Sequence, residues 1–381
     1  AVGADVAIRL TTTPASLQTK LGDLSSKNLS GKFAGNDPKG QHKDWTKEFA
    51  GWKGQTSAQK LLRSWFKALD DAAVARSNGT IGTAPDGSKL KYVHVSADGL
   101  DYKQLIGKVL GVSVAFNQGV DDYLDDDLDG KGLLADHTKP EKDGANYTAL
   151  SHAWDEGFGY FGAARDYGDY TDDEIAGKSG RDDWKTGAHD TDGDGKIDLT
   201  KERNFGHSVN AAKRDRGSKN LAPTDFTKAA FDAFLAGRHL LATTKGALTA
   251  EELASLTGYR DVIVQAWELA IAATVVHYVN DVLGDMKTIG TKDYNFYDHA
   301  KHWSELKGFA LGLQYNRRSP LSSADFVQFH TLVGDAPVLP TKPAADITAY
   351  AKALRTARGV LVKAYGFDAK LVGDDDGQGG W

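Results

Sequence analysis

Hydrophobic residues recur along most of the chain with the spacing of amphipathic α-helices. In residues 57–76, Leu61, Trp65 and Leu69 fall on one face of a helix with about 3.6 residues per turn. The same periodicity predicts further helices at residues 100–124, 146–163, 224–241, 249–286, 293–316, 322–333 and 344–365. The pattern therefore predicts a mostly α fold of one or two helical bundles.

Long stretches rich in Gly and Asp separate the predicted helices. They cover residues 31–54, 125–144 and 167–220 and have no hydrophobic period. Long connections of this kind are usually functional, stabilised by ions or disordered. We expect residues 1–145 to form N-terminal helices and loops, and residues 146–381 to form a helical region with an inserted loop at 182–220. One continuous domain is the alternative.

Charge and cysteine content narrow the classes of function. The 381 residues include 46 Lys and Arg against 52 Asp and Glu, which gives a net charge of −6. This balance offers no basic surface for nucleic acid, so we expect no nucleic-acid partner. The absence of cysteine excludes disulfides, thiolate nucleophiles, Cys-ligated zinc and iron–sulfur clusters. Any metal must then be held by carboxylates, carbonyls and imidazoles.

The start of the chain and its apolar segments bear on location. The sequence begins at Ala1 without a charged and then apolar leader, so we expect an exported protein whose signal peptide has been removed. The expected location is the periplasm, the cell surface or the extracellular space. The longest apolar stretch, residues 262–279, is interrupted by Gln265, Glu268 and His277. We therefore expect no segment that inserts into a membrane.

Residues 190–202 follow the pattern of a calcium-binding loop. Acidic side chains stand at the first, third, fifth and ninth positions, and Gly195 at the sixth allows the sharp turn. The seventh position would contribute a backbone carbonyl. The twelfth position departs from the pattern, because Lys201 stands there and the acid follows one residue later. The predicted calcium ligands are Asp190, Asp192, Asp194, Lys196, Asp198 and Glu202.

A second acidic loop keeps part of the same pattern. Asp125, Asp127 and Asp129 occupy the first, third and fifth positions, and Asp136 the twelfth. Gly132 stands at the eighth position, where an apolar residue is usual. A solvated run of charge explains this loop equally well. Calcium is one cofactor that the sequence predicts, as a structural ion rather than a switch.

Two predicted helices combine histidine with carboxylate on one face. His152 is followed by Glu156 one turn later, and His302 by Glu305. A third helix carries His277, with Asp281 one turn on. Imidazoles and carboxylates that project inward from several helices are the usual ligands of a bundle metal site. The predicted metal ligands are His152, Glu156, His277, His302 and Glu305.

The same residues have a purely structural interpretation. A histidine on an amphipathic helix is often a core residue that a neighbouring carboxylate satisfies. The glycines near these segments indicate close helix approach, because glycine lowers helix propensity. They are Gly157, Gly159, Gly162, Gly308 and Gly312. A metal site and a buried network need the same glycines, so both interpretations stay open.

The segment from His152 to Gly162, His-Ala-Trp-Asp-Glu-Gly-Phe-Gly-Tyr-Phe-Gly, resembles the hallmark of a bacterial family of exported proteins whose domain has no assigned function. The segments at 98–106, 276–280, 301–310, 313–316 and 332–335 match that family in the same order. More distantly, the helical organisation and the pair His302 and Glu305 are similar to the imelysins. The imelysin motif has Gly two residues before its histidine, whereas Ala300 stands there in this chain.

The resemblance to imelysins implies an imelysin-like helical bundle in the periplasm or at the cell surface, linked to iron acquisition. We therefore expect a metal-binding protein rather than an enzyme, with calcium-stabilised loops and iron or another divalent transition metal as cofactor. A protein partner is compatible with this expectation. The alternatives are a non-catalytic, calcium-stabilised surface or structural protein, and a metallopeptidase.

Overall fold

The structure is a computed structural model that describes residues 5–36 and 39–381. Within these residues, 53% of the chain is helical, with 12 helices and no strands. The mostly α fold that the sequence predicts is confirmed. The likeness to imelysins and the calcium in the loops stay predictions.

The chain divides into two compact units, and neither is continuous in sequence. Unit 1 comprises Ala1–Gly40, Gln118–Lys219 and Pro223–Ala270. Unit 2 comprises Gln41–Asn117, Asn220–Ala222 and Ile271–Trp381. Helices that are distant in sequence pack together in unit 2, so each unit draws on several segments of the chain. The expected boundary at residue 145 stays a prediction.

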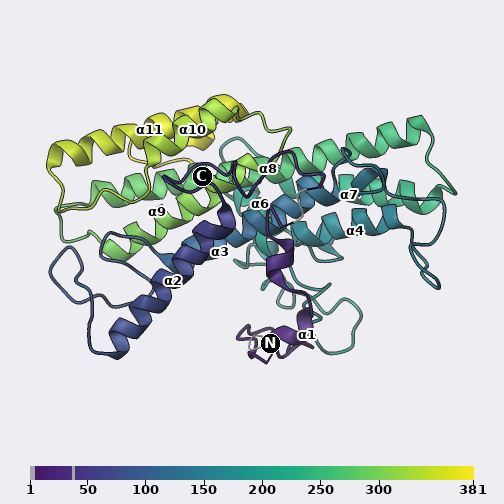
Figure 1. Cartoon of the computed structure of the whole chain (residues 1–381), viewed down its shortest axis with the longest axis horizontal. Coiled ribbons are helices and arrows are strands. Elements are labelled where there is room, and N and C mark those ends of the chain that lie inside the picture. The colour runs from purple at the N-terminus through teal and green to yellow at the C-terminus, as the bar shows by residue number, and fades with distance from the viewer. Residues whose placement is uncertain (1–4, 37–38) are drawn as a thin grey trace. The chain divides into compact units, whose positions relative to one another are not determined.

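Unit 1 is built around a pair of packed helices. Its elements are α1 (Leu21–Leu24), η1 (Leu29–Lys32), η3 (Gly119–Tyr123), η4 (Gly132–Leu134), α4 (Ala149–Phe161), η5 (Tyr167–Asp169), α5 (Asp172–Ile175), α6 (Gly206–Ser218), α7 (Phe226–Thr243) and the first part of α8 (Ala250–Lys287). Helices α4 and α7 run side by side (Figure 1). Thr148 and Asp225 cap their N-termini by accepting backbone hydrogen bonds.

The contact between α4 and α7 depends on a glycine. Trp154 of α4 is 1% exposed, and its Nε1 donates to the backbone oxygen of Phe234 at 2.9 Å. A Cβ added at Gly237 of α7 would lie 2.1 Å from the Trp154 ring. Only a residue without a side chain allows this approach.

Unit 2 joins an N-terminal pair of helices to the C-terminal helices. Its elements are α2 (Ala58–Ser77), α3 (Tyr102–Leu110), η2 (Gly111–Phe116), the rest of α8, α9 (Phe296–Ala310), η6 (Leu311–Gln314), α10 (Ser323–Val333), α11 (Ala344–Tyr365) and α12 (Ala369–Val372). Helix α3 packs on α9, and α10 on α11 (Figure 1). Trp303 of α9 is fully buried and donates to the Tyr350 hydroxyl at 2.8 Å, which fixes the rotation of α9.

The predicted role of the motif glycines in close packing holds at four of the five positions. A Cβ would lie 2.8 Å from Leu124 at Gly157, 2.7 Å from Lys108 at Gly308 and 2.5 Å from Val112 at Gly312. Gly162 ends α4 in a left-handed conformation, with the Phe205 backbone against it. Gly159 differs, because a Cβ there would meet nothing within 4 Å.

Helix α8 is long and apolar enough to cross a membrane by length and composition alone. Its most apolar window has a mean hydropathy of 1.6. The expectation that no segment inserts into a membrane stays a prediction, since this criterion averages hydropathy over a window and so tolerates the polar residues that interrupt α8. In the structure, 72% of this window is buried inside the protein. Buried core helices pass the same test as membrane-spanning ones.

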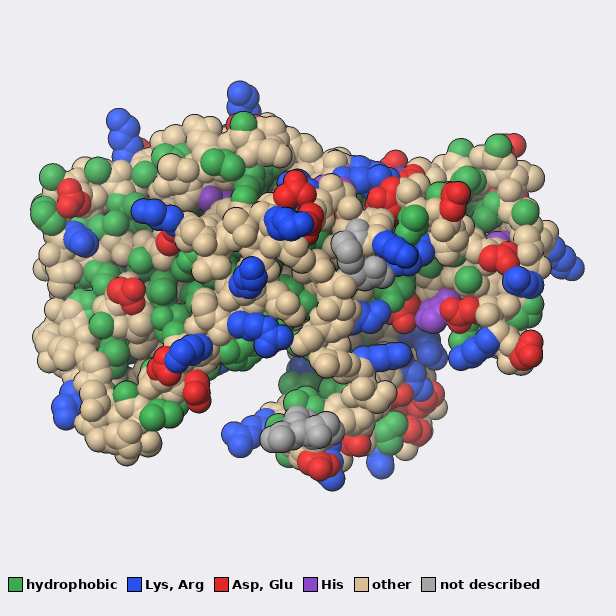
Figure 2. Space-filling view, in the orientation of Figure 1, with side chains coloured by type: hydrophobic (Ala, Val, Ile, Leu, Met, Phe, Trp, Pro, Cys, Tyr) green, Lys and Arg blue, Asp and Glu red, His purple; other side chains and the backbone are tan. Residues whose placement is uncertain are grey.

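Charged side chains of both signs are interspersed over the face of the molecule that Figure 2 shows. Apolar side chains are visible between them. The net charge of −6 is therefore not gathered into one field on this face.

Candidate functional site

In unit 2, helices α8 and α9 bring imidazoles and carboxylates together. His277, Asp281 and Asp285 follow one another at intervals of four residues and so share one face of α8. The Asp281 Oδ2 lies 3.4 Å from His277 Nε2 and 3.9 Å from His302 Nε2 of α9. We call His277, Asp281, Asp285, His299 and His302 the His/Asp cluster.

Asp285 fixes the orientation of His302. Its Oδ2 lies 2.8 Å from His302 Nδ1, which leaves Nε2 on the side of Asp281. Burial alone would lower the pKa of His302, but the hydrogen bond and the charge of Asp285 raise it. A carboxylate that holds one nitrogen of an imidazole while the other is free is the usual outer support of a histidine metal ligand.

His299 adds a neutral imidazole to the cluster. It is fully buried, and burial lowers its pKa to about 4. Its Nδ1 lies 3.1 Å from the Tyr294 hydroxyl, and its Nε2 has no hydrogen-bond partner in the described residues. A neutral imidazole is the form that binds metals.

Most side chains of the cluster are partly exposed to solvent. Their ligand atoms do not converge on a common point. The side chains of His277, Asp281, Asp285 and His302 are between 18% and 31% exposed. Within the described residues, Asp190, Asp192 and Asp194 form a group of three ligand atoms that all lie within 4.8 Å of one another, and the residues of the His/Asp cluster do not. One ion shared by the cluster therefore requires its side chains to move closer together than they are in this structure.

The other predicted metal ligands have different partners. Glu305 is 4% exposed and pairs with Lys108 of α3 at 3.1 Å. His152 and Glu156 belong to unit 1, where His152 Nδ1 lies 2.7 Å from Glu141 and Nε2 lies 3.2 Å from Glu156. Burial lowers the pKa of His152, but the two carboxylates raise it overall. The predicted set is thus divided between the two units.

The calcium-type loop of unit 1 brings its first three acidic side chains together. Asp190, Asp192 and Asp194 each place one oxygen within 4.8 Å of the others. The N–H groups of Gly193 and Gly195 donate to Asp190 at 2.9 and 2.8 Å, which curls the loop around this side chain. Gly195 has a φ of +82°, which glycine adopts without strain.

At the end of this loop, Lys201 places its ammonium group among the acidic side chains, which include Glu202. The Lys201 Nζ lies 2.6 Å from Asp192, 3.9 Å from Asp198 and 4.0 Å from Glu202 Oε1. Glu202 is 2% exposed, and its Oε1 accepts no hydrogen bond in the described residues. Three carboxylates therefore surround the ammonium group of Lys201, at the position in sequence where a calcium loop usually has an acid.

The remaining predicted calcium ligands have other contacts. Asp198 Oδ1 accepts hydrogen bonds from Gln18 and Thr200, and Lys196 N–H donates to Asp194. In the second acidic loop, the described residues do not bring Asp125, Asp127, Asp129 and Asp136 into a group of three within 4.8 Å. Asp136 instead accepts hydrogen bonds from Thr138. Calcium at the second loop stays a prediction without geometric support.

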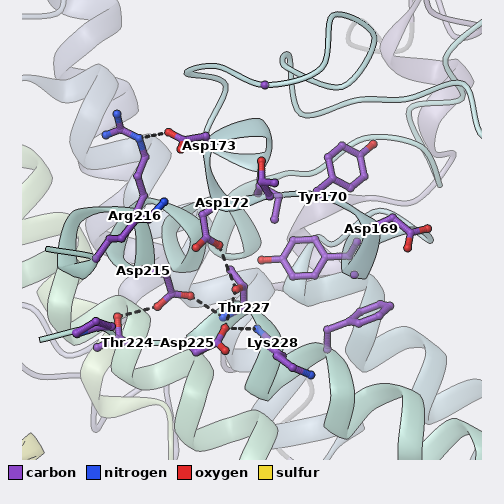
Figure 3. Close-up of a pocket in the computed structure, with 18 of the residues that line it drawn as sticks. Asp169, Tyr170, Asp172, Asp173, Asp215, Arg216, Thr224, Asp225, Thr227 and Lys228 are labelled. Atoms are coloured by element: carbon purple, nitrogen blue, oxygen red, sulfur yellow. Dashed lines mark hydrogen bonds and ion pairs between the residues drawn. The ribbon is translucent and has the colours of Figure 1, made fainter.

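A large acidic cavity in unit 1 was not predicted from the sequence. It has a volume of about 830 Å³ and lies between η5, α5, α6 and the start of α7 (Figure 3). Its six carboxylates are Asp169, Asp172, Asp173, Asp215, Asp225 and Asp232. Several of them support the fold, since Asp215 accepts the N–H groups of Phe226 and Thr227 at the start of α7, and Asp173 pairs with Arg216.

Asp172 is the carboxylate of this cavity with the clearest electrostatic cost. Burial and then the charge of Asp215 raise its pKa to about 6. A raised pKa means that the ionised form is less stable in the folded chain, so stability falls as the pH rises through 6. Replacement by Asn keeps the oxygen that accepts the hydrogen bond from Thr227 and removes the charge.

We expect Asp172→Asn to stabilise the chain at pH 7 and not at pH 4. The shift corresponds to roughly 3 kcal/mol for a fully buried group, and solvent screening of this partly exposed side chain reduces it to about 1 kcal/mol. Urea unfolding followed by circular dichroism at the two pH values measures the difference. A gain of equal size at pH 4, or a loss at pH 7, would contradict the electrostatic origin.

The structure reveals residues of the candidate sites that spacing in the sequence did not predict. Asp285 belongs to the His/Asp cluster, and its only signal in the sequence is that it follows His277 by eight residues on one helix face. The acidic cavity joins segments that are up to about sixty residues apart and has no local motif. Helix α6, which contributes Asp215, is too polar for hydrophobic periodicity to reveal.

Comparison with protein families identifies a match. Residues 46–176 match a domain of unknown function (DUF4856). This region includes the segment from His152 to Gly162. No curated protein and no solved structure matches the chain. The match marks an uncharacterised family and assigns no activity.

Proposed function

We propose that the chain binds a divalent transition-metal ion at the His/Asp cluster. The observation that carries the proposal is the position of Asp281, whose carboxylate lies within 4 Å of His277 Nε2 and of His302 Nε2. Two imidazoles and a carboxylate from two packed helices are a common ligand set for such ions. Asp285 supports His302 from behind, at 2.8 Å.

The ligand set limits the kind of metal without selecting one. Imidazole and carboxylate ligands suit zinc, iron, manganese and copper alike. The resemblance to imelysins favours iron, and with it a role in metal acquisition for an exported protein. Glu305 has no place in this proposal, because its carboxylate pairs with Lys108. No observation in the described residues favours the metallopeptidase alternative.

Titration of the full chain with cobalt(II) tests the proposal, since bound cobalt gives visible absorption that reports its ligands. We expect binding of one ion per chain with imidazole ligation. His302→Ala and His277→Ala are expected to remove the absorption. His152→Ala and His239→Ala, the latter an exposed histidine of α7, serve as controls that leave it unchanged. Saturable absorption that persists in both cluster variants would overturn the proposal, as would the lack of any in the wild type.

We also propose that the loop at residues 190–202 holds calcium, as a structural ion of unit 1. The supporting observation is the buried Glu202, whose Oε1 lacks a hydrogen-bond partner and lies 4.0 Å from Lys201 Nζ. With the convergent Asp190, Asp192 and Asp194, this gives a cation a further oxygen. Calcium would have to displace Lys201 from Asp192, so the lysine competes with the ion. Calcium binding at this loop without a transition metal at the His/Asp cluster would describe a calcium-stabilised structural protein.

The competition predicts opposite effects of two substitutions. Lys201→Ser is expected to raise calcium affinity about tenfold, since it removes a cation from the site, and Asp192→Asn to lower it by a similar factor. Calcium-dependent shifts of the melting temperature measure both, because an ion that binds the folded state stabilises it. Lys185→Ser, which breaks an exposed pair with Asp182, is the control. A wild-type chain that calcium does not stabilise would refute the calcium proposal.

A further inference from the structure

A second cavity of unit 1 lies against the segment that resembles the family hallmark. It has a volume of about 420 Å³ and is lined by residues of α4, α7 and the loops at 163–165 and 200–201. Cavities of this size accommodate small organic molecules. This cavity is separate in its residues from the His/Asp cluster and from the acidic cavity, except that Phe231 borders both cavities.

Aromatic rings form one wall of this cavity. The Phe158 ring lies 5.3 Å from that of Phe234 and 6.3 Å from that of Phe231. Trp154 packs on Phe234 at 5.9 Å and donates its N–H to the backbone beneath it, so the wall is held in place from two helices. Such a wall binds flat apolar groups by stacking and edge contacts.

Gly159 keeps the cavity open at this wall. It lines the cavity from α4, and a Cβ at its position would meet nothing within 4 Å. The other motif glycines are required by close contacts, whereas packing gives no reason for glycine here. Its effect in the structure is to leave free space above the helix, beside Phe158.

The rim of the cavity carries more positive than negative charge. Arg165, Lys201 and Arg238 line it together with a single carboxylate, Asp155. Arg238 pairs with Asp155 at 2.9 Å, and Lys201 pairs with Asp192 outside the cavity. Arg165 forms no ion pair in the described residues, so its guanidinium group is available to a ligand.

We propose that this cavity binds a small organic anion with an aromatic body, whose ring packs on the Phe158 wall and whose anionic group pairs with Arg165. The aromatic wall provides the apolar contact, and the excess of cations selects the sign of the charge. An organic cation or a neutral ring would bind more weakly, since neither can form an ion pair with Arg165 at the rim. The site is separate from the His/Asp cluster, and it shares Thr200 and Lys201 with the calcium-type loop at residues 190–202.

Fluorescence titration of the full chain with two matched dyes tests this proposal. Anilinonaphthalene sulfonate carries an anionic group, and phenyl naphthylamine has the same rings without it. We expect one sulfonate dye per chain, bound at least about tenfold more tightly than the neutral dye. Arg165→Gln should reduce this preference to less than about threefold and leave the neutral dye unaffected.

Filling the cavity provides the second arm of the test. Gly159→Leu should weaken binding of both dyes at least about tenfold, while helix propensity keeps α4 folded. Gly258→Leu adds the same side chain to an exposed position of α8 in unit 1, where a Cβ also meets nothing within 4 Å, and should leave binding unchanged. Equal wild-type affinities for the two dyes would overturn the proposal, as would unweakened sulfonate binding in Gly159→Leu or an unchanged preference in Arg165→Gln.

Discussion

Replacing Trp154 with Ala is expected to lower the free energy of unfolding of the chain by about 4 kcal/mol, the usual cost of removing a buried Trp. The ring is 1% exposed, packs on Phe234 and fits against Gly237 of α7. Its loss would leave a cavity between α4 and α7 and remove the hydrogen bond to the Phe234 backbone. Urea unfolding followed by circular dichroism measures the change without relying on tryptophan fluorescence.

A double-mutant cycle identifies the helix contact as the cause. Gly237→Ala alone should cost about 2 kcal/mol, because its Cβ would overlap the Trp154 ring. The same change in Trp154→Ala should cost little, since the space is then empty. Trp184→Ala, at a half-buried loop residue stacked on His189, is the control and should cost no more than about 1 kcal/mol. Additive effects of the two substitutions would show that α4 and α7 do not meet there.

Asp281→Asn is expected to weaken binding of zinc or cobalt about 100-fold, which equals about 2.7 kcal/mol. Asp281 is the group that both imidazoles approach, so the amide would replace a charged ligand by a neutral one. Asp285→Asn should weaken binding only about tenfold, because Asp285 contacts His302 at the nitrogen away from Asp281 and acts through its orientation. Competition with a chromophoric chelator measures both affinities.

The order of these two effects distinguishes the roles of the carboxylates. Asp298→Asn, at an exposed first-turn residue of α9, is the matched control and should leave affinity within about twofold. An effect of Asp285→Asn that exceeds that of Asp281→Asn would place the ion on the other side of His302 and contradict the assignment given above.

Hydrophobic periodicity was sufficient for most of the helices and for the fold class. The predicted helix at 249–286 is α8 (Ala250–Lys287), and that at 344–365 is α11 (Ala344–Tyr365). Hydrophobic periodicity did not reveal a helix whose buried residues are polar. Helix α6 buries Arg214 and Asp215 in place of an apolar stripe, so no 3.6-residue pattern of apolar residues marks it.

The candidate sites also differ in how far the sequence could predict them. A site formed by one short segment could be predicted, whereas the contacts of a site formed by two helices could not. The loop at Asp190 could be predicted because a single short segment supplies its geometry. His277 and His302 could be selected as ligands, but their partners depend on how α8 meets α9, which spacing within one helix does not encode. For that reason the sequence paired His302 with Glu305, whereas the structure pairs it with Asp285.

The metal content of the full chain, purified without chelators, tests whether the His/Asp cluster binds a transition-metal ion. We expect one transition-metal ion per wild-type chain and none in the double variant Asp281→Asn, His302→Ala, with circular dichroism showing that the variant is folded. Calcium content, set by the separate loop at 190–202, should be the same in both. Wild-type chain without a transition metal, or a folded double variant that retains it, would contradict the claim.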